Sequence, residues 1–227
     1  MKISALMPVK GFANAKQRLA SLLSASDREI LAEAMFKDVL RQVLSARGLE
    51  ETFVVTGDGR VSEIASSMGA SVIQETEERG ETEAVLFAQA RLKQKGVPVA
   101  LIIPADIPLV RSSDIELLLQ AVPSAGPASP FALLVPSHDR MGTNALLLSP
   151  PDVIKPRFGY DSFAYHLGQV GARGLPQRVL ENERIALDID EPKDLERFLS
   201  LGSGEGEAYG KARGMAALLG PRSCERL

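Results

Sequence analysis

The sequence predicts an α/β fold in which a mostly parallel sheet is flanked by helices. Short apolar or β-branched runs of strand length alternate with longer amphipathic segments of helical period along the chain. Residues 99–103 form an unbroken run of Val, Ala, Leu and Ile, which is typical of a central strand that is buried on both faces. The length of 227 residues allows one sizeable core. These observations indicate an α/β sandwich organised around that strand.

Composition excludes several classes of function. A hydrophobic share of 45%, a charged share of 24% and a formal net charge of -3 are ordinary for a globular protein. This balance gives no basic surface, so no nucleic-acid partner is expected. The apolar run at the start is too short for a secretory signal and no later run approaches membrane-spanning length, so a cytoplasmic protein without a membrane partner is expected. The single cysteine, Cys224, excludes an intrachain disulfide and a cysteine-based metal site.

Strand and helix signals alternate through the first half of the chain. Ser26 and Glu29 have the spacing of a capping box and open a helix with a wide apolar stripe, which Gly48 closes. A second capping-box spacing begins at Ser113 and opens another helix. The other expected strands and helices of this half are strands at 3–8, 52–56 and 71–73 and helices at 61–68 and 83–95.

The pattern changes in the second half. Two strand candidates, 131–136 and 145–148, are joined by a polar connection, which predicts a hairpin-type insertion over the sheet edge. The elements expected after this hairpin are a helix from 161 or 162, a strand at 177–180 and a helix from 192.

Residues 1–200 are expected to form a single domain. From residue 201 onward, Gly, Ser and Glu alternate in a way that predicts a flexible linker. We therefore expect residues 201–227 to be linker and C-terminal tail, in which 208–219 form a short helix or are disordered.

A basic, glycine-containing loop follows the first strand. It carries Lys10, Gly11, Lys16 and Arg18. A backbone that wraps phosphates, with cations that neutralise them, has this composition. The spacing of a Walker loop is absent, and the alternative is that the three cations are simply solvated charges.

Three aspartates suggest a metal site. Asp106 ends the central strand, and the ligand crevice of a parallel sheet lies outside the carboxyl ends of its strands. Asp188 and Asp190 are two residues apart, so an extended backbone places both carboxylates on one face and turns Ile189 into the core. Facing carboxylates repel unless a cation lies between them. The alternatives are that Asp106 caps a turn between two prolines and that the pair forms an exposed acidic turn.

The expected helix start near Asp161 is a candidate anion site. Gly159 precedes it, and the free N–H groups and the dipole of a helix start attract anions. Separately, the basic loop, Asp106 and the pair Asp188 and Asp190 together predict nucleotidyl transfer. In that chemistry Mg²⁺ neutralises a triphosphate while lysines draw charge from the leaving pyrophosphate.

Five motifs, in the same order along residues 1–200, carry a resemblance to a known family. They are Pro-Val-Lys at 8–10 with Lys16, Arg18 and Leu19, Pro-Ala-Asp-Ile-Pro-Leu at 104–109, Gly-Thr-Asn-Ala-Leu at 142–146, Phe-Gly-Tyr-Asp-Ser-Phe at 158–163 with His166, and Leu-Asp-Ile-Asp at 187–190. The chain with these motifs resembles the 2-phospho-L-lactate guanylyltransferase family, which includes the phosphoenolpyruvate guanylyltransferases and serves coenzyme F-420 biosynthesis.

The resemblance implies a fold and a reaction. The fold would be a Rossmann-like sandwich of the nucleotide-diphospho-sugar transferase type. The enzyme would transfer GMP from GTP to the phosphate of 2-phospholactate, phosphoenolpyruvate or 3-phosphoglycerate and release pyrophosphate. No protein nucleophile is needed, because a phosphate dianion is already deprotonated at neutral pH. A homodimer is the assembly that the resemblance suggests.

The resemblance also assigns roles to individual residues. The Mg²⁺ ligands would be Asp106, Asp188 and Asp190. The phosphate and carboxylate of the acceptor would be held by Thr143, Asn144, Gly159 and Ser162. The residues expected to bind the nucleotide are Pro8, Val9, Lys10, Gly11, Lys16, Arg18, Gly80, Glu81 and Asp106. Those expected to act in catalysis are Lys10, Lys16 and Asp106.

One segment departs from the family pattern. Family members usually carry Gly-Leu-Asn where the helix before the central strand opens, whereas this chain has Gly80, Glu81 and Thr82. Glu81 can accept hydrogen bonds from guanine N1 and N2 or from ribose hydroxyls, but it repels phosphates, so base choice stays open. The alternative functions are a nucleotidyltransferase of the same fold with another base or acceptor, and a catalytically silent nucleotide-binding protein. His138 and His166 are expected to pack or hydrogen-bond rather than catalyse.

Overall fold

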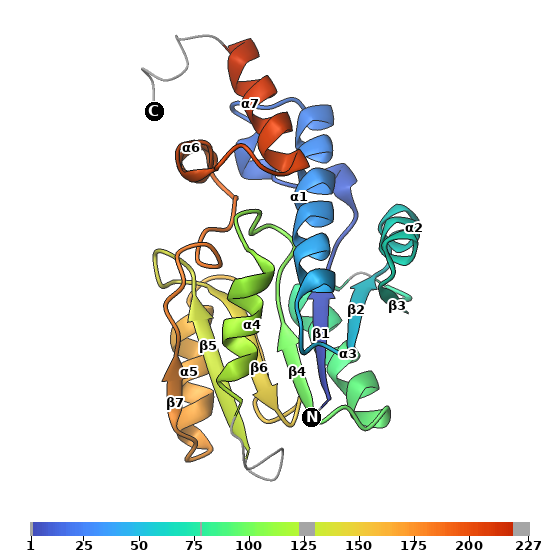
Figure 1. The fold of residues 1–227 in the computed structure, drawn as a ribbon, viewed down its shortest axis with the longest axis vertical. Coiled ribbons are helices and arrows are strands. Elements are labelled where there is room, and N and C mark those ends of the chain that lie inside the picture. Colours follow the sequence, from blue (N-terminus) through green and yellow to red (C-terminus); the bar gives the residue numbers. More distant parts are fainter. Residues whose placement is uncertain (1, 78, 123–129, 220–227) are drawn as a thin grey trace.

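A seven-stranded sheet forms the centre of the computed structural model, which describes residues 2–77, 79–122 and 130–219 (Figure 1). The strands are β1 (Ile3–Pro8), β2 (Glu51–Thr56), β3 (Ser71–Gln74), β4 (Val99–Ile102), β5 (Phe131–Pro136), β6 (Thr143–Ser149) and β7 (Gln177–Val179). The helices are α1 (Ala25–Ser45), α2 (Gly59–Met68), α3 (Glu81–Gln94), α4 (Ser112–Gln120), α5 (Ser162–Ala172), α6 (Pro192–Leu201) and α7 (Glu207–Leu219). The predicted alternation of strands and helices is confirmed. Cys224 lies outside the described residues.

The sheet has the order β3-β2-β1-β4-β6-β5-β7. Parallel pairing joins β3, β2, β1 and β4, and also β5 and β7, while β6 runs antiparallel to both of its neighbours. The predicted hairpin is confirmed as a pairing but was wrongly placed over the sheet edge, because β6 is hydrogen-bonded between β4 and β5. As a result, the carboxyl ends of β1, β2, β4 and β5 meet the start of β6 at one edge.

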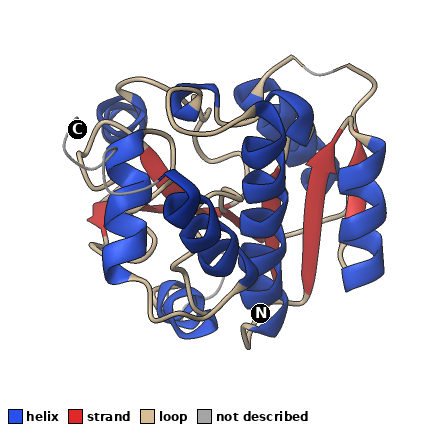
Figure 2. Cartoon of the chain, turned by 90° about the horizontal axis from the view of Figure 1, so that it is seen from above, coloured by secondary structure: helices blue, strands red, loops and turns tan. Residues whose placement is uncertain are grey.

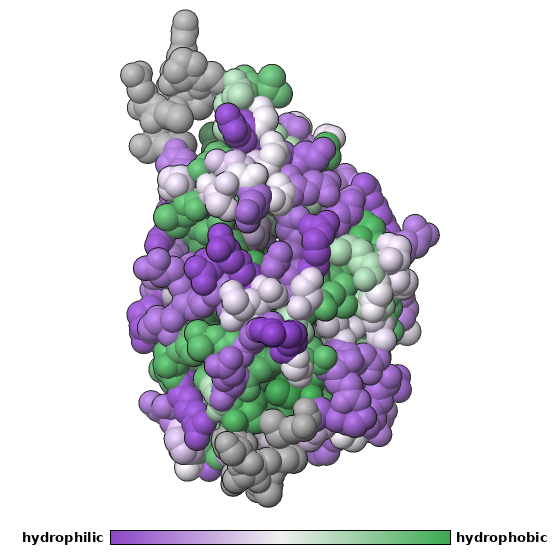
Figure 3. All heavy atoms as spheres, viewed as in Figure 1, coloured by the Kyte–Doolittle hydropathy of each residue, from purple (hydrophilic) through white to green (hydrophobic). Residues whose placement is uncertain are grey.

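Alternating side chains of the strands build a core on each face of the sheet. Met7 of β1 packs with α1, α2 and α4, whereas Leu6 packs on the opposite face with α3 and α5. Seen from above, helices surround the strands (Figure 2). On the face that carries α1 and α4, hydrophilic residues predominate, and apolar atoms gather in the lower half of the view (Figure 3). Across residues 2–77, 79–122 and 130–219, no helix has both the length and the apolar character needed to cross a bilayer.

Helices α2 and α3 each begin two residues before the expected start, and the starts of α1 and α4 are capped by residues other than those expected. Helix α1 is capped by Ser24, whose Oγ accepts a hydrogen bond from the Asp27 N–H at 3.1 Å, so the cap lies two residues before Ser26. Helix α4 is preceded by Arg111, whose N–H donates to Asp114 at 2.9 Å. In both cases an aspartate three residues after the cap stabilises the start, a shorter version of the capping box.

The tail is not only a linker. Helix α7 packs along α1, and its residues Ala208, Ala212 and Met215 are buried in a third apolar cluster with α1 and α6. The small alanines allow the two helices to approach closely. Of the two alternatives expected for 208–219, the short helix is confirmed, as Glu207–Leu219, and it packs on an apolar face of α1 instead of extending freely from the domain. Residues 220–227 lie outside the described part of the chain.

The cap of α7 gives a stability prediction. The buried Asp38 of α1 accepts a hydrogen bond from the Ala208 N–H at 2.8 Å. We expect Asp38→Ala to lower the free energy of unfolding by about 1 kcal/mol or more, since it leaves a helix start without its acceptor. Asp38→Asn is the matched control, because its amide oxygen keeps the acceptor. Urea unfolding of both variants tests this, and equal stabilities of Asp38→Ala and the unchanged protein would contradict the docking of α7.

Candidate functional site

Two adjoining cavities open at the carboxyl edge of the sheet. The first, of about 580 Å³, lies beside the loop after β1, and we call it the Lys10 cavity. The second, of about 460 Å³, lies between the start of β6, the start of α5 and the 188–194 segment, and we call it the Thr143 cavity. Four residues line both of them: Glu81, Pro104, Asp106 and Asp190. The shared wall makes the two cavities suitable for two molecules that meet near Asp106.

The sequence-predicted residues divide between the two cavities. The Lys10 cavity is lined by Pro8, Val9, Lys10, Gly11, Lys16, Gly80, Glu81, Asp106 and Asp190. The Thr143 cavity is lined by Arg18, Glu81, Asp106, Thr143, Asn144, Gly159, Ser162, Asp188 and Asp190. Arg18, expected beside the nucleotide, thus lies on the other side of the shared wall, where its guanidinium is 3.8 Å from Asp190 and 3.6 Å from Glu191.

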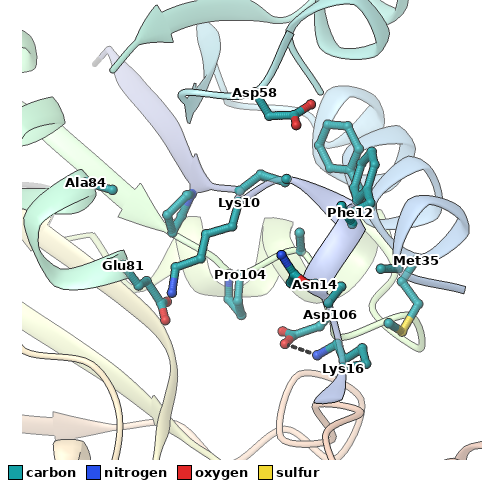
Figure 4. A pocket seen from close by; sticks show the side chains of 18 of the residues that line it. Lys10, Phe12, Asn14, Lys16, Met35, Asp58, Glu81, Ala84, Pro104 and Asp106 are labelled. Carbon is teal, nitrogen blue, oxygen red and sulfur yellow. Dashed lines mark hydrogen bonds and ion pairs between the residues drawn. The ribbon is translucent and has the colours of Figure 1, made fainter. Parts of the chain in front are cut away.

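Lys16 is the cation at the centre of the site. Two short 3-10 turns, Phe12–Asn14 and Gln17–Leu19, fold the loop after β1, and Lys16 joins them with a left-handed backbone (φ 51°). Its ammonium lies 2.6 Å from Asp106 and 2.9 Å from Asp190 (Figure 4). Its side chain is only 10% exposed. The loop therefore inserts one positive charge between carboxylates from two distant segments.

A backbone hydrogen bond holds the two acidic segments together. The Ile189 N–H donates to the Asp106 carbonyl at 3.0 Å, and the Ile189 side chain is fully buried. Asp188 and Asp190 on either side of it both line the Thr143 cavity, as the extended-segment prediction requires. Asn144 donates its amide to Asp188 and to the Ile185 carbonyl, both at 3.0 Å. Asn144 therefore orients the acidic segment.

The pKa values of Asp188 and Asp190 are shifted in opposite directions. Burial, followed by repulsion from Asp106 and Asp190, raises the pKa of Asp188 to about 6. Burial also acts to raise the pKa of Asp190, but the Lys16 ammonium outweighs it and the net shift is downward. Burial opposes the charge of Lys16, yet Asp106 and Asp190 raise its pKa. Lys16 partly neutralises Asp106 and Asp190, so among the described residues the negative charge of Asp188 remains without a cation beside it.

The acidic cluster fits a divalent cation in the kind of donor it supplies. Asp106, Asp188 and Asp190 offer the carboxylate oxygens that Mg²⁺ prefers, and Lys16 already shows that the space between two of them accepts a cation. Among the described residues, however, no group of three or more His, Cys, Asp or Glu side chains lies close enough together to hold a metal ion. The position of Lys16 accounts for this spacing, because its ammonium separates Asp106 from Asp190.

Glu81 occupies the wall between the cavities. It is the first residue of α3, next to Gly80 with its positive φ of 99°, and its carboxyl group points toward the Lys10 ammonium (Figure 4). Burial and then the charge of Asp106 raise its pKa to about 7, against the lowering effect of Lys10. Near neutral pH this side chain is divided between its acid and its carboxylate, so it can donate as well as accept a hydrogen bond.

Glycine is required at position 11. A Cβ on Gly11 would lie 2.6 Å from the Asp58 carboxylate oxygen. Asp58 cannot easily retreat, because its other oxygen accepts from the Val61 N–H at 2.9 Å and caps α2. The loop after β1 therefore passes directly over the start of α2, which sets the shape of the Lys10 cavity.

The start of α5 provides side chains rather than free backbone donors. The N–H of Ser162 donates to the Gly159 carbonyl at 3.2 Å and that of Phe163 donates to the Met141 carbonyl at 3.4 Å. The predicted anion site built from these N–H groups is thus wrong for the first two residues of the helix. The hydroxyls of Thr143 and Ser162 remain as polar groups of the Thr143 cavity.

Several lining residues were not predicted as part of the site. In the Lys10 cavity they include Asp58 and Glu75, and in the Thr143 cavity they include His138, Lys193 and Asp194. Asp58 follows the strand β2 within Gly-Asp-Gly, and the same strand-end rule that singled out Asp106 points to it. Asp194 gave no such signal, because it looks like an ordinary residue of the first turn of α6, where it accepts a hydrogen bond from the N–H of the cap residue Glu191.

His166 is buried and neutral, and this predicts an acid-dependent loss of stability. Burial, and then the charge of Arg157, lower its pKa from 6.5 to about 4. The unfolded chain therefore binds this proton at higher pH than the folded chain, so the stabilisation is complete above pH 6.5 and is lost as the pH falls toward 4. We expect this group to remove about 3 kcal/mol across that window. Urea unfolding across the window should show a shallower acid dependence for His166→Gln, and an unchanged dependence would contradict the assignment.

Comparisons of sequence show which proteins the chain is similar to. It matches the family described as "Guanylyl transferase CofC like" over residues 3–216. A phosphoenolpyruvate guanylyltransferase of Conexibacter woesei is 34% identical over 215 residues, 95% of each chain. A 2-phospho-L-lactate guanylyltransferase of Methanothermobacter thermautotrophicus is 33% identical over 90% of this chain and 87% of that protein. A 3-phospho-D-glycerate guanylyltransferase of Colwellia psychrerythraea is 35% identical over 89% of this chain and 94% of that protein.

Solved structures are similar in fold. A protein described as a nucleotide-diphospho-sugar transferase from Desulfovibrio desulfuricans superposes with a TM-score of 0.76 at 18% identity, over 96% of both chains. A cytidylyltransferase from Leptospira borgpetersenii superposes with a TM-score of 0.62 at 15% identity, over 99% of this chain and 96% of that one. At these identities the likeness extends to the sandwich architecture, and it agrees with the fold class expected from the sequence.

Proposed function

This chain belongs to the CofC-like guanylyltransferase family, and from that premise we propose that it transfers GMP from GTP to the phosphate of a small phosphorylated acid and releases pyrophosphate. The acids named for its relatives are phosphoenolpyruvate, 2-phospho-L-lactate and 3-phospho-D-glycerate. All three have three carbons, one phosphate and one carboxylate, and this is the acceptor class that we assign to the Thr143 cavity.

The observation that carries the proposal is the shared wall of the two cavities. A nucleotide in the Lys10 cavity and a phosphorylated acid in the Thr143 cavity would meet at Asp106, Glu81 and Asp190. Two anions approach each other there, so the main obstacle to reaction is electrostatic. Lys10, Lys16 and Arg18 supply the positive charge of the loop after β1, and Lys16 is held in place before either substrate binds.

In this proposal the protein accelerates the reaction mainly by positioning its two substrates. An oxygen of the acceptor phosphate would attack the α-phosphorus of GTP in line, forming one P–O bond while the bond from that phosphorus to the bridging oxygen of pyrophosphate breaks. The acceptor oxygen is already deprotonated, so no protein base or nucleophile is required. Fixing the two molecules across the shared wall converts their encounter into an effectively unimolecular step. The lysines would stabilise the charge that builds up on the leaving pyrophosphate.

We assign a Mg²⁺ site to Asp106, Asp188 and Asp190 as part of this proposal. The ion would neutralise phosphate oxygens of the nucleotide and polarise the α-phosphorus. The excess negative charge at Asp188 supports the assignment, as does the Lys16 ammonium between the other two. The Asn144 amide orients Asp188 for this role.

The wider setting follows the sequence resemblance. The guanosine diphosphate-linked acid would enter coenzyme F-420 biosynthesis, and the protein would act in the cytoplasm as a homodimer. Glu81 supports the choice of guanine, because a carboxyl group at the start of α3 can accept hydrogen bonds from N1 and N2 of that base. A cytosine or uracil offers no such adjacent pair of donors.

The experiment that tests the proposal is pyrophosphate release by the purified protein with Mg²⁺. Each of the four nucleoside triphosphates is combined with each of the three acids. Release with GTP and one of the acids, and none when the acid is omitted, is the expected result. Release with another nucleotide would keep the reaction class and reject the base, and no release with any pair would favour a silent nucleotide-binding protein.

A further inference from the structure

His166 links Thr143, which lines the Thr143 cavity, to the loop before α5. Its Nδ1 lies 2.9 Å from Thr143 Oγ1 at the start of β6, and its Nε2 accepts from the Arg157 N–H at 3.0 Å. The side chain is fully buried. Phe158 and Tyr165 pack edge-on to its ring, with centroids 5.6 Å and 5.7 Å away. The ring is therefore fixed in position and shielded from water.

The hydrogen-bond partners determine which nitrogen carries the proton. A backbone N–H can only donate, so the Arg157 N–H requires a lone pair on Nε2. Burial keeps the ring neutral at physiological pH. A neutral ring without a proton on Nε2 must carry it on Nδ1. His166 consequently donates to Thr143 Oγ1.

This donation leaves the hydrogen of the Thr143 hydroxyl unused by His166. An oxygen that accepts from Nδ1–H has its own hydrogen left to donate elsewhere. Within the part of the chain that the structure describes, the Thr143 side chain makes no second hydrogen bond. Thr143 lines the Thr143 cavity, so this hydrogen is available to a bound oxygen there.

We propose that His166 is a positioning residue that keeps the Thr143 hydroxyl hydrogen free to donate to an anionic oxygen of the acceptor. The proposal rests on the function proposed above and adds the element that selects the charge of the acceptor. A threonine that donated to His166 would have no hydrogen left for a ligand, whereas Thr143 that accepts from His166 keeps its hydrogen for the cavity. The cavity thereby favours a carboxylate or phosphate oxygen over a neutral donor group of similar size.

Two substitutions separate the two hydrogen bonds of His166. The amide nitrogen of Asn stands at the same number of bonds from Cα as Nδ1, so His166→Asn keeps the donor to Thr143 and loses the acceptor for Arg157. The amide of Gln extends to the position of Nε2, so His166→Gln keeps the acceptor for Arg157 and loses the donor to Thr143. If His166 only filled space, both substitutions would change the KM for the acceptor acid by the same factor.

We expect His166→Gln to raise the KM for the acceptor acid about tenfold or more while the KM for GTP stays within twofold. His166→Asn should recover most of that loss. On the isosteric Thr143→Val background, His166→Gln should add no further increase, since the hydroxyl that His166 contacts is already gone. Equal losses in both His166 variants, or a further increase on the Thr143→Val background, would overturn the proposal.

A binding measurement separates this proposal from the function it rests on. Calorimetric titration with phosphoenolpyruvate, 2-phospholactate and 3-phosphoglycerate, without nucleotide turnover, should rank the unchanged protein and its four variants by affinity for the acid that binds in the same order as their KM values. If the unchanged protein binds one acid but transfers nothing, the proposed reaction fails while the ranking still decides the role of His166. If transfer occurs and all variants bind the acid with the same affinity as the unchanged protein, the reaction stands and the role of His166 is rejected.

Discussion

Asp106→Asn is expected to reduce nucleotidyl transfer by on the order of a thousandfold or more. Asp106 lines both cavities, its carboxylate pairs with Lys16, and its carbonyl accepts the hydrogen bond from the Ile189 N–H. The change preserves the shape of the side chain and removes its charge. The Lys16 ammonium then keeps only Asp190 as an ion-pair partner. The proposed Mg²⁺ site loses one ligand.

A matched control lies on the far side of the molecule. Lys93 and Asp152 form an ion pair with the same 2.6 Å separation as Lys16 and Asp106, and neither lines the two cavities. Asp152→Asn should leave turnover unchanged. Steady-state pyrophosphate release, with circular dichroism to confirm folding, measures both variants. Comparable activity of Asp106→Asn and Asp152→Asn would reject Asp106 as a catalytic residue.

Lys16→Met is expected to lower kcat/KM for GTP by about a hundredfold or more. Methionine has a similar length and no charge, so the substitution removes the ammonium from between Asp106 and Asp190 without opening a large cavity. The carboxylates then repel each other and the triphosphate loses a prepositioned cation. Lys93→Met removes the matching charge of the distant pair and should have no effect on turnover.

The Mg²⁺ dependence of Lys16→Met distinguishes two roles of the lysine. If Lys16 contacts the nucleotide, added Mg²⁺ should not restore activity, because the ion replaces the charge between the acids but not the contact with phosphate. Full recovery at high Mg²⁺ would show that Lys16 serves only as a counter-ion for Asp106 and Asp190. If the substitution raised only the KM for the acceptor acid, Lys16 would act on the acceptor and not on the nucleotide.

The sequence predicted the parts of the site that follow from regular geometry. Asp106 was found because strand ends of a parallel sheet share one edge, and Asp188 and Asp190 because alternate residues of an extended segment face one way. The buried Ile189 follows from the same alternation. The position of β6 between β4 and β5 did not, since an apolar strand carries no mark of which neighbour it will pair with.

The parts that escaped prediction depend on long-range or irregular structure. Lys16 reaches its two partners only because its backbone is left-handed between two 3-10 turns. His166 was expected to serve in packing or hydrogen bonding, but its two partners lie on another strand and in a loop, and only the folded chain reveals them. Helix α7 looked like part of a tail because the linker before it is rich in Gly, and its docking depends on a face of α1 that no local pattern identifies.

The central claim is that GMP is transferred to the phosphate of the acceptor. The most direct measurement is ³¹P NMR of a reaction of the purified protein with GTP, Mg²⁺ and the acid that supports pyrophosphate release. The account predicts free pyrophosphate together with a new pair of coupled diphosphate resonances, as the acceptor phosphate resonance disappears in equal amount. Formation of GDP with a doubly phosphorylated acid, or of GMP with the acceptor unchanged, would contradict it.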